Sequence, residues 1–264
     1  MFNESREKYK DNVNKFLIAK VIDKYEFCKT KNKITYTDFL DISQKSIIKK
    51  FIKEEKISNY VFYGGKENSD REILIFYPDK LSNEFLQKNY NKILNIIKIK
   101  LPNEISYEHR EFLSGIMKLG VKREKFGDII VLEDGAEIIC LSEISEYLKN
   151  NLQGLTRFKK SKISIKDMND LTMKENEFEN IKIIVSSNRL DSFVSELAKC
   201  SRSKASEIIK EGRVFVNSIN EFKDSKKVNI GDIITIRGKG KFIFESVEKE
   251  TRSGNNLLNI NKYK

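Results

Sequence analysis

One segment, Asn188 to Asn217, constrains the fold of this chain more than any other part of it. Its sequence, NRLDSFVSELAKCSRSKASEIIKEGRVFVN, places apolar residues first at the spacing of two short helices and then at the spacing of a strand. Ser201 stands where the second helix needs an N-cap, and Gly212 stands where that helix needs a left-handed C-terminal cap. The segment therefore predicts a compact helix–helix–strand unit with basic side chains at the starts of its helices.

This segment resembles the alpha-L RNA-binding motif, the S-four-type module of a small-subunit ribosomal protein, of bacterial tyrosyl-tRNA synthetases and of many RNA-modifying enzymes. The residues that carry the likeness are Arg189-Leu190-Asp191, Ser201-Arg202, Ala205, Ile209, Gly212, Val214, Val216, Asn217, Lys226, Val228, Gly231-Asp232 and the strand from Ile233 to Arg237. The likeness extends from about Lys182 to the C-terminus. It implies an alpha-L RNA-binding domain over residues 182–264.

The net positive charge of the chain favours a polyanionic partner. Its formal net charge is +11, and its pI is about 9.3. Residues from Lys182 onward hold 17 basic and 10 acidic side chains, which gives the last third of the sequence a net charge of +7. The attraction for a nucleic acid is therefore expected to be strongest in the C-terminal part.

No pattern in the sequence indicates export, membrane insertion or a metal centre. The N-terminus is charged from Glu4 onward and lacks the apolar core of a signal peptide. No stretch approaches the roughly 20 apolar residues of a transmembrane helix. The three cysteines, Cys28, Cys140 and Cys200, lack metal-ligand spacing. We therefore expect a cytoplasmic protein that uses no membrane, no metal and no cofactor.

The remaining sequence predicts two further parts and an α+β fold class. Residues 1–78 show helical spacing followed by two short apolar runs, which is typical of a mostly helical domain with a small hairpin. Residues 79–168 follow the order strand, helix, strand, strand, helix, strand, with a tight Asp134-Gly135 turn between the central strands. This order is the split βαβ arrangement of ferredoxin-like domains. The polar stretch 169–180 is expected to lead into the C-terminal module.

Taken together, these parts resemble the bacterial YlmH family. Outside the C-terminal module, the residues that carry this wider likeness are Phe62 to Gly65, Asp70-Arg71, His109 to Leu113, Leu119 to Arg123 and Gly127 to Ile129. The resemblance implies that the middle domain is a second RNA-binding domain. It also implies a role in ribosome-associated quality control, in which family members bind large ribosomal subunits obstructed by peptidyl-tRNA. The expected partners are ribosomal RNA, tRNA and the large ribosomal subunit, and we expect a monomer.

The basic residues of the C-terminal module are the candidate RNA contacts. The first N–H groups of a helix lack partners within it, so the start of the second helix offers a site for a backbone phosphate. The expected RNA-binding residues are Arg189, Ser201, Arg202, Lys204, Arg213, Lys226, Lys227, Arg237, Lys239 and Lys241. A second candidate RNA patch consists of Lys122, Arg123 and Lys125. The alternative for each cation is a solvated helix face, and Phe242 and Phe244 are expected in the strand core rather than stacked on bases.

Two other functions remain open at this level: an rRNA-modifying enzyme or its accessory subunit, and a cell-division interaction factor. Arg189-Leu190-Asp191 has a superficial likeness to the catalytic Arg-Leu-Asp of pseudouridine synthases, but Ser192 follows where those enzymes have a threonine and a glycine. The sole histidine, His109, has no cysteine or serine constellation near it in the sequence. We therefore predict a non-enzymatic protein. Cofactor-dependent turnover would favour the enzyme, and RNA-independent binding to division proteins would favour the interaction factor.

Overall fold

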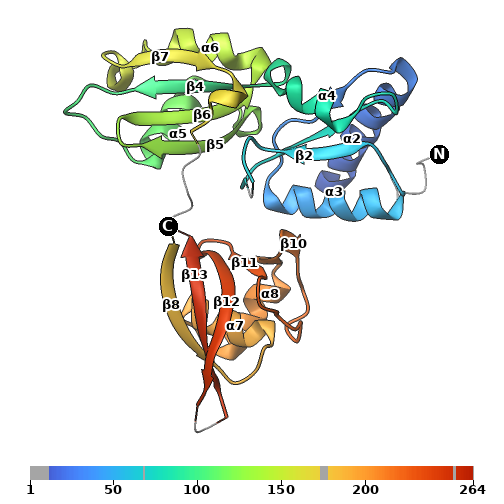
Figure 1. The fold of residues 1–264 in the computed structure, drawn as a ribbon, viewed down its shortest axis with the longest axis vertical. Coiled ribbons are helices and arrows are strands. Elements are labelled where there is room, and N and C mark those ends of the chain that lie inside the picture. Colours follow the sequence, from blue (N-terminus) through green and yellow to red (C-terminus); the bar gives the residue numbers. More distant parts are fainter. Residues whose placement is uncertain (1–11, 68, 173–177, 252–253, 264) are drawn as a thin grey trace. The chain divides into compact units, whose positions relative to one another are not determined.

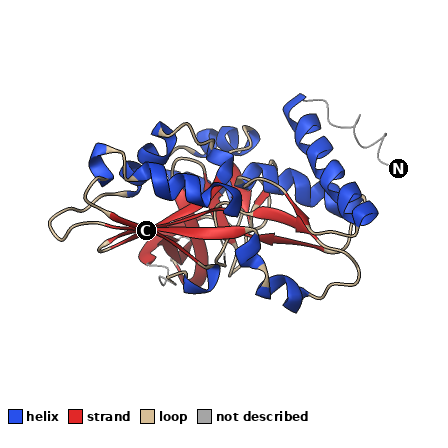
Figure 2. Cartoon of the chain, turned by 90° about the horizontal axis from the view of Figure 1, so that it is seen from above, coloured by secondary structure: helices blue, strands red, loops and turns tan. Residues whose placement is uncertain are grey.

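The chain folds into two compact units that contain both helices and strands. The computed structural model describes residues 12–67, 69–172, 178–251 and 254–263 (Figure 1). Unit 1 is Met1–Lys174 and unit 2 is Glu175–Lys264. Helices and strands occur in both units (Figure 2), so the expected α+β class is confirmed. Among the described residues, no helix has the length and hydropathy that a membrane span requires.

The first part of unit 1 packs two helices on a small antiparallel sheet with the strand order β1-β3-β2. Its elements are α2 (Asn12–Lys31), β1 (Thr35–Tyr36), α3 (Ile42–Glu54), β2 (Tyr60–Tyr63) and β3 (Ile73–Phe76). Helix α3 begins at a capping box, because Asp41 accepts from the Gln44 N–H at 2.9 Å and the Gln44 side chain accepts from the Asp41 N–H at 2.8 Å. The expected helices and hairpin strands are confirmed, and β1 is an addition to them.

The second part of unit 1 is the predicted ferredoxin-like arrangement. Its elements are β4 (Leu94–Lys100), α5 (His109–Lys118), β5 (Phe126–Leu132), β6 (Gly135–Leu141), α6 (Ser142–Leu152) and β7 (Lys162–Lys166). The strands are antiparallel in the order β5-β6-β4-β7, so the split βαβ prediction is confirmed. The β5–β6 turn requires Gly135, because its φ is +150° and a Cβ there would lie 1.9 Å from the Ile99 carbonyl oxygen.

Short helical elements complete unit 1 between and after these parts. They are α4 (Asn83–Lys88), η1 (Tyr90–Lys92), η2 (Arg123–Lys125), η3 (Thr156–Phe158) and η4 (Met168–Asp170). Ser82 is the N-cap of helix α4, because its hydroxyl oxygen accepts from the Phe85 N–H at 3.2 Å. The turn η2 leads directly into β5 and thereby fixes the basic residues that precede that strand.

Both faces of the ferredoxin-like sheet are covered. Helices α5 and α6 pack on one face, where Ile97 of β4 meets Phe112 of α5 in a buried cluster. On the opposite face, Ile96 of β4 meets Ile73 of β3 in another cluster. Because neighbouring strand residues point to opposite faces, burial on both sides explains why every residue of β6 is buried. The N-terminal and middle domains that the sequence separates therefore share a core within one compact unit.

Unit 2 is an antiparallel sheet with two helices on one face (Figure 1). Its elements are β8 (Phe178–Val185), α7 (Leu190–Ala198), α8 (Arg202–Lys210), β9 (Val214–Val216), β10 (Ile219–Asn220), β11 (Ile233–Ile236), β12 (Gly240–Glu250) and β13 (Asn256–Tyr263). The strand order is β10-β9-β11-β12-β13-β8. Phe193 of α7 and Ile209 of α8 pack into the core of the sheet. Phe242 and Phe244 are 2% and 1% exposed, so their expected place in the strand core is confirmed.

Candidate nucleic-acid interface

The two caps predicted for the second helix are both present in unit 2. The Ser201 hydroxyl oxygen accepts from the Lys204 N–H at 3.3 Å, which makes Ser201 the N-cap of α8. Gly212 has a φ of +70°, and its N–H donates to the Ile209 carbonyl oxygen at 2.9 Å, as in a left-handed C-terminal cap. The caps fix where α8 begins and ends, and thereby where the basic residues at its two ends lie.

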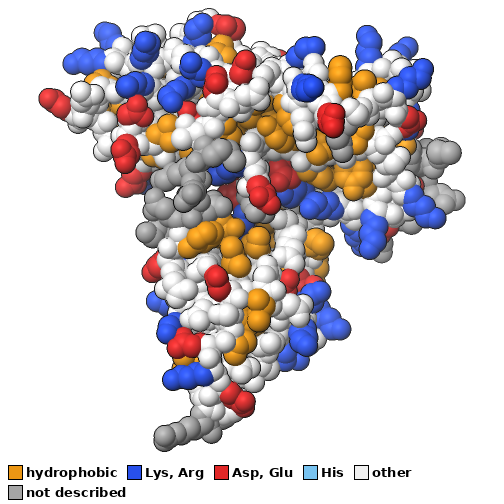
Figure 3. Space-filling view, in the orientation of Figure 1, with side chains coloured by type: hydrophobic (Ala, Val, Ile, Leu, Met, Phe, Trp, Pro, Cys, Tyr) orange, Lys and Arg blue, Asp and Glu red, His pale blue; other side chains and the backbone are white. Residues whose placement is uncertain are grey.

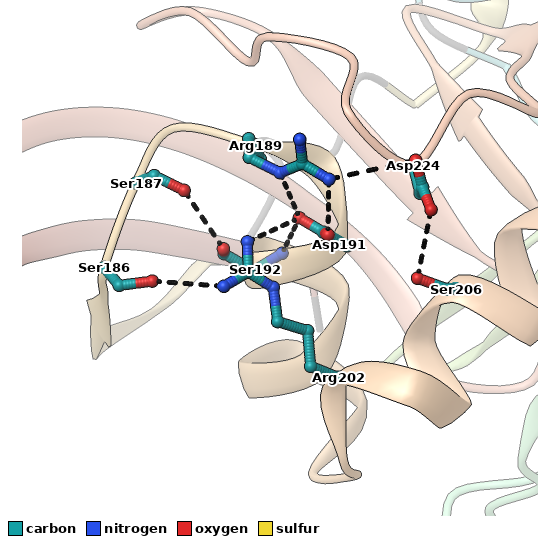
Figure 4. A network of polar contacts seen from close by, with 8 residues as sticks. All are labelled: Ser186, Ser187, Arg189, Asp191, Ser192, Arg202, Ser206 and Asp224. Atoms are coloured by element: carbon teal, nitrogen blue, oxygen red, sulfur yellow. Dashed lines mark hydrogen bonds and ion pairs between the residues drawn. The ribbon is translucent and has the colours of Figure 1, made fainter.

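One buried carboxylate holds two of the candidate arginines at the start of α7 (Figure 4). Asp191, in the first turn of α7, is 4% exposed. Arg189 donates to both of its oxygens, from Nε to Oδ1 at 3.1 Å and from Nη2 to Oδ2 at 2.8 Å. Arg202, the first residue of α8, donates from Nη2 to Oδ1 at 3.2 Å. Arg189 and Arg202, which we name the arginine pair, are therefore fixed relative to each other by a shared anion.

Electrostatics explain why Asp191 remains charged in this buried place. Burial by itself would raise the pKa of Asp191, but the hydrogen bonds and charges of Arg189 and Arg202 lower it to about 2. The Ser192 N–H donates a further bond to Asp191 Oδ1 at 2.9 Å. At neutral pH the carboxylate is thus ionised, and it keeps both guanidinium groups in place.

The arginine pair is still accessible to a ligand. The side chains of Arg189 and Arg202 are 42% and 48% exposed. Arg189 also lies 3.8 Å from Asp224, whose second oxygen accepts from the Ser206 hydroxyl at 3.3 Å. A guanidinium has more N–H donors than these contacts use, so the pair can bind an external oxyanion without releasing Asp191.

Two candidate lysines join the arginine pair through a loop that crosses the start of α7. The Leu190 N–H donates to the Lys226 carbonyl oxygen at 2.8 Å, and Arg189 forms an isolated β-bridge with Lys227. Both lysine side chains are exposed. We name the surface of Arg189, Arg202, Lys226 and Lys227 the α7-start surface. It gathers four of the ten residues that the sequence analysis selected, from three separate segments.

Three other candidates lie together at the opposite end of α8. Arg213 donates from Nη2 to the Arg237 carbonyl oxygen at 3.3 Å, and the Arg237 N–H donates to the Arg213 carbonyl oxygen at 2.9 Å. The Arg237 guanidinium also stacks over the Phe215 ring, 5.5 Å from its centroid. Exposed Lys239 follows in the β11–β12 turn. Because a nine-residue helix is about 13 Å long, this second group is separated from the α7-start surface.

The remaining candidates of unit 2 have local roles. Lys204 Nζ pairs with Glu207 at 2.7 Å on the exposed side of α8. Lys241 lies with its Nζ 4.9 Å from the centroid of the Tyr263 ring. Lys204, Lys241 and Ser201, which caps α8, lie next to the two basic groups but are not part of either.

The second candidate patch, Lys122, Arg123 and Lys125, does not form one open surface. Lys125 donates to Asp38 at 2.8 Å and to Glu143 at 2.9 Å, and these bonds raise its pKa although burial opposes the rise. Arg123 is partly buried and donates to the Phe126 carbonyl oxygen, so of the three residues only Lys122 is exposed. On the face shown in Figure 3, basic side chains occur over both units and alternate with acidic ones.

The described residues contain no group of three His, Cys, Asp or Glu side chains that could hold a metal ion. A cavity of about 390 Å³ in unit 1 is lined by charges of both signs, including Lys20, Asp38, Lys125 and Glu143. Lys125 pairs with both Asp38 and Glu143, so these three charges of the lining are already engaged with one another.

Sequence reasoning missed the role of Asp191 as the anchor of the arginine pair. In the sequence, Asp191 figures only as part of the Arg189-Leu190-Asp191 motif. A signal was available, because this acidic residue lies directly after Leu190 and two residues before Phe193, both of which belong to the core. A carboxylate in such a position is buried and needs a cationic partner.

Each unit contains a segment that matches a known domain family. Residues 86–172 match a family model described as "Putative RNA-binding domain in YlmH", and residues 188–234 match the S4 domain. The chain is 28% identical over 219 residues to the "Ribosome-associated protein quality control protein P2" of Bacillus subtilis (strain 168), which covers 82% of each protein.

A solved structure also shows a weak likeness. It is the "Cell division protein ylmH from Streptococcus pneumoniae", which matches with a TM-score of 0.43 and 19% sequence identity. The match covers 60% of this chain and 92% of that protein. A likeness at this level supports no argument about the function of the chain.

Proposed function

We propose that this chain is a non-enzymatic RNA-binding protein of the YlmH family that acts in ribosome-associated quality control, because it carries matches to both a YlmH-type RNA-binding domain and an S4 domain. Its site of action in this proposal is a large ribosomal subunit that still holds a peptidyl-tRNA, where it acts as a monomer that contacts ribosomal RNA and tRNA. The observation that carries the proposal is the arginine pair on its buried carboxylate.

The geometry of the arginine pair suits the RNA backbone. Both guanidinium groups present N–H donors in a fixed fork, which matches the oxygens of a phosphate better than a lysine ammonium does. Asp191 holds the two forks in one arrangement before RNA arrives, so less side-chain entropy is lost on binding. Exposed Lys226 and Lys227 extend the positive surface along the same edge of unit 2.

Contacts between these guanidinium groups and backbone phosphates recognise the shape of a folded RNA and the spacing of its phosphates. The deep groove of A-form RNA excludes side chains, so phosphates and sugars are the groups that a surface of arginines and lysines can reach. A structured rRNA helix and a tRNA stem both present their phosphates and sugars in this way. The relative in Bacillus subtilis bears a name from ribosome-associated quality control, which supports the ribosome as the place where such RNA is met.

The proposal is tested by gradient sedimentation of the protein with ribosomal particles from cells. We expect the wild-type protein to sediment with large subunits enriched in peptidyl-tRNA. The Arg189→Gln, Arg202→Gln protein should remain at the top of the gradient. A matched control is Lys182→Gln, Lys262→Gln, which removes two exposed charges from β8 and β13 of the same unit.

Three outcomes decide between the functions. Loss of sedimentation in the arginine variant but not in the lysine control supports the α7-start surface. Association of the wild-type protein with small subunits alone contradicts quality control and favours rRNA modification. Binding to division proteins without RNA, and no ribosomal association, contradicts the proposal in favour of an interaction factor.

A further inference from the structure

Segments of unit 1 that are far apart in the sequence meet beside the start of β5. The N–H groups of Asp70 and Arg71 donate to the two oxygens of Asp128, each at 3.1 Å. The Phe39 N–H donates to the Glu124 carbonyl oxygen at 2.8 Å. These bonds join the loop before β3 and the segment between β1 and α3 to the ferredoxin-like part.

The close approach at this place depends on a glycine. A Cβ at position 127 would lie 2.5 Å from the Phe39 ring, so Gly127 lets β5 and the N-terminal part come into contact. The sequence analysis singled out Asp70-Arg71, His109, Arg123 and Gly127-Asp128 as separate motifs. The structure brings them to one place.

Two arginines converge at this junction. Arg71 donates from Nη2 to the Phe39 carbonyl oxygen at 3.1 Å, and its buried Nε has no hydrogen-bond partner. Arg123 donates from Nη1 to the carbonyl oxygens of Phe126 and Gly127 at 2.7 and 3.1 Å. Most N–H donors of the two guanidinium groups are therefore not used by the protein. We name Arg71 and Arg123 the junction arginines.

The junction arginines repel each other, and the described residues provide neither with an ion pair. Burial and the charge of Arg71 together lower the pKa of Arg123 to about 10, against the attraction of Asp128. Burial also lowers the pKa of Arg71, against the attraction of Asp41, Asp128 and Glu124. Asp128 does not neutralise the arginines by direct contact, because its oxygens are bound by backbone N–H groups.

A third polar group, the exposed imidazole of His109, interacts electrostatically with Arg123 and Asp70. His109 begins α5, and its pKa is lowered by partial burial and by the charge of Arg123, against the attraction of Asp70. Its imidazole is thus neutral at neutral pH and can donate a hydrogen bond without adding charge. Two half-buried guanidinium groups with unused donors, beside a neutral imidazole, are the groups that coordinate a phosphate.

The sheet of the ferredoxin-like part cannot serve as an RNA platform. Many RNA-recognition domains stack bases on an open sheet face. Here α5 and α6 cover one face, and the N-terminal sheet covers the other. A nucleic acid that contacts this sheet directly must therefore reach one of its edges, and β5 is an edge strand.

From this geometry we propose that Arg71, Arg123 and His109 form a binding site for an RNA backbone phosphate. The N-terminal part supplies Arg71, and the ferredoxin-like part supplies Arg123 and His109, so neither part forms the site alone. This inference rests on the proposed function for its ligand, because RNA is the polyanion that the S4 domain binds in that proposal. It adds a second RNA contact on unit 1, separate from the α7-start surface.

The test uses the full chain and purified large-subunit rRNA as the probe, with affinity measured over a range of salt concentrations. The Arg71→Gln, Arg123→Gln protein should bind about tenfold more weakly at roughly 0.15 M salt, and its salt slope should fall by about 1 for each phosphate that the variant no longer neutralises. The matched control is Arg157→Gln. Arg157 is a half-buried arginine of unit 1 that donates to the Glu111 carbonyl oxygen and to the Ser114 hydroxyl.

A conservative variant separates binding from folding. Arg71→Lys, Arg123→Lys keeps both charges but loses the planar fork, so we expect it to keep most of the salt slope and to lose part of the affinity. Nuclear magnetic resonance of the arginine Nε–H groups gives a direct readout, since inorganic phosphate should shift the signals of Arg71 and Arg123 and leave that of Arg157 unchanged. Unshifted signals, or an unchanged salt slope in the glutamine variant, overturn the inference.

Failure of this inference is distinguishable from failure of the proposed function. If Arg189→Gln, Arg202→Gln abolishes ribosomal association while the junction variant binds rRNA like the wild type, the proposed function stands and the second site is refuted. If the junction variant loses affinity while the Arg189, Arg202 variant does not, the second site stands and the α7-start surface is refuted.

Discussion

Replacing Asp191 by asparagine removes the anion that holds the arginine pair while keeping the size of the side chain. The pKa of Asp191 lies at about 2 in the folded protein, against an ordinary 3.8. Because one pKa unit corresponds to about 1.4 kcal/mol, the ionised carboxylate contributes about 2 kcal/mol to the stability of unit 2. We therefore expect Asp191→Asn to lower the free energy of unfolding of unit 2 by about this amount at neutral pH.

The pH dependence of this difference has a definite sign. A carboxylate whose pKa is lowered by folding stabilises the protein above its unfolded pKa, and it loses this contribution as the pH falls through the folded pKa. The wild-type advantage over Asp191→Asn should be complete above about pH 5 and should shrink between pH 3.8 and about 2. Affinity for rRNA should also fall severalfold at neutral pH, because Arg189 and Arg202 are no longer preorganised.

Urea unfolding followed by hydrogen exchange of α7 and β12 peptides measures unit 2 separately from unit 1. The control is Asp224→Asn, which should cost well under 1 kcal/mol because that carboxylate is 32% exposed and lies 3.8 Å from Arg189. An Asp191→Asn protein as stable as the wild type at pH 7, or a stability difference that persists unchanged at pH 2, would refute the reasoning.

Three further substitutions and one chemical treatment test the fold. Gly212→Val should destabilise unit 2 by about 1 kcal/mol or more in urea unfolding, because a β-branched residue is strained at a φ of +70°. Phe244→Ala should cost about 3–5 kcal/mol in the same assay, since the ring is 1% exposed within the core. Lys204→Gln should change stability by less than about 0.5 kcal/mol, because its pair with Glu207 is exposed. Cys140 should resist iodoacetamide in the folded protein at pH 8 and react after unfolding, because burial raises its thiol pKa to about 12.

Features set by local chemistry were predictable from the sequence. The caps at Ser201 and Gly212 follow from the side chain of one residue and the backbone freedom of the other, so both were identified without the structure. The ferredoxin-like order followed from strand periodicity and from the turn at Gly135. The core positions of Phe242 and Phe244 followed from alternation along a strand.

Features set by packing between distant segments were not predictable in the same way. The two residues of β1 are too few to show periodicity, and only pairing with β3 makes them a strand. The link between Arg202 and Asp191 depends on how α7 turns into α8. The ten candidate RNA contacts include two groups at opposite ends of α8, and a linear sequence does not display that separation.

The shared core of unit 1 has a consequence for where the chain can be cut. The family model that describes the RNA-binding domain begins at residue 86, yet Ile96 and Ile139 on one face of its sheet pack against Ile73 from outside that range. A recombinant fragment 86–172 would leave this apolar face open to water and is expected to aggregate. The smallest transplantable piece of unit 1 is therefore larger than the stretch that sequence similarity delineates, and any chimaera that exchanges this domain between relatives must carry the N-terminal sheet with it.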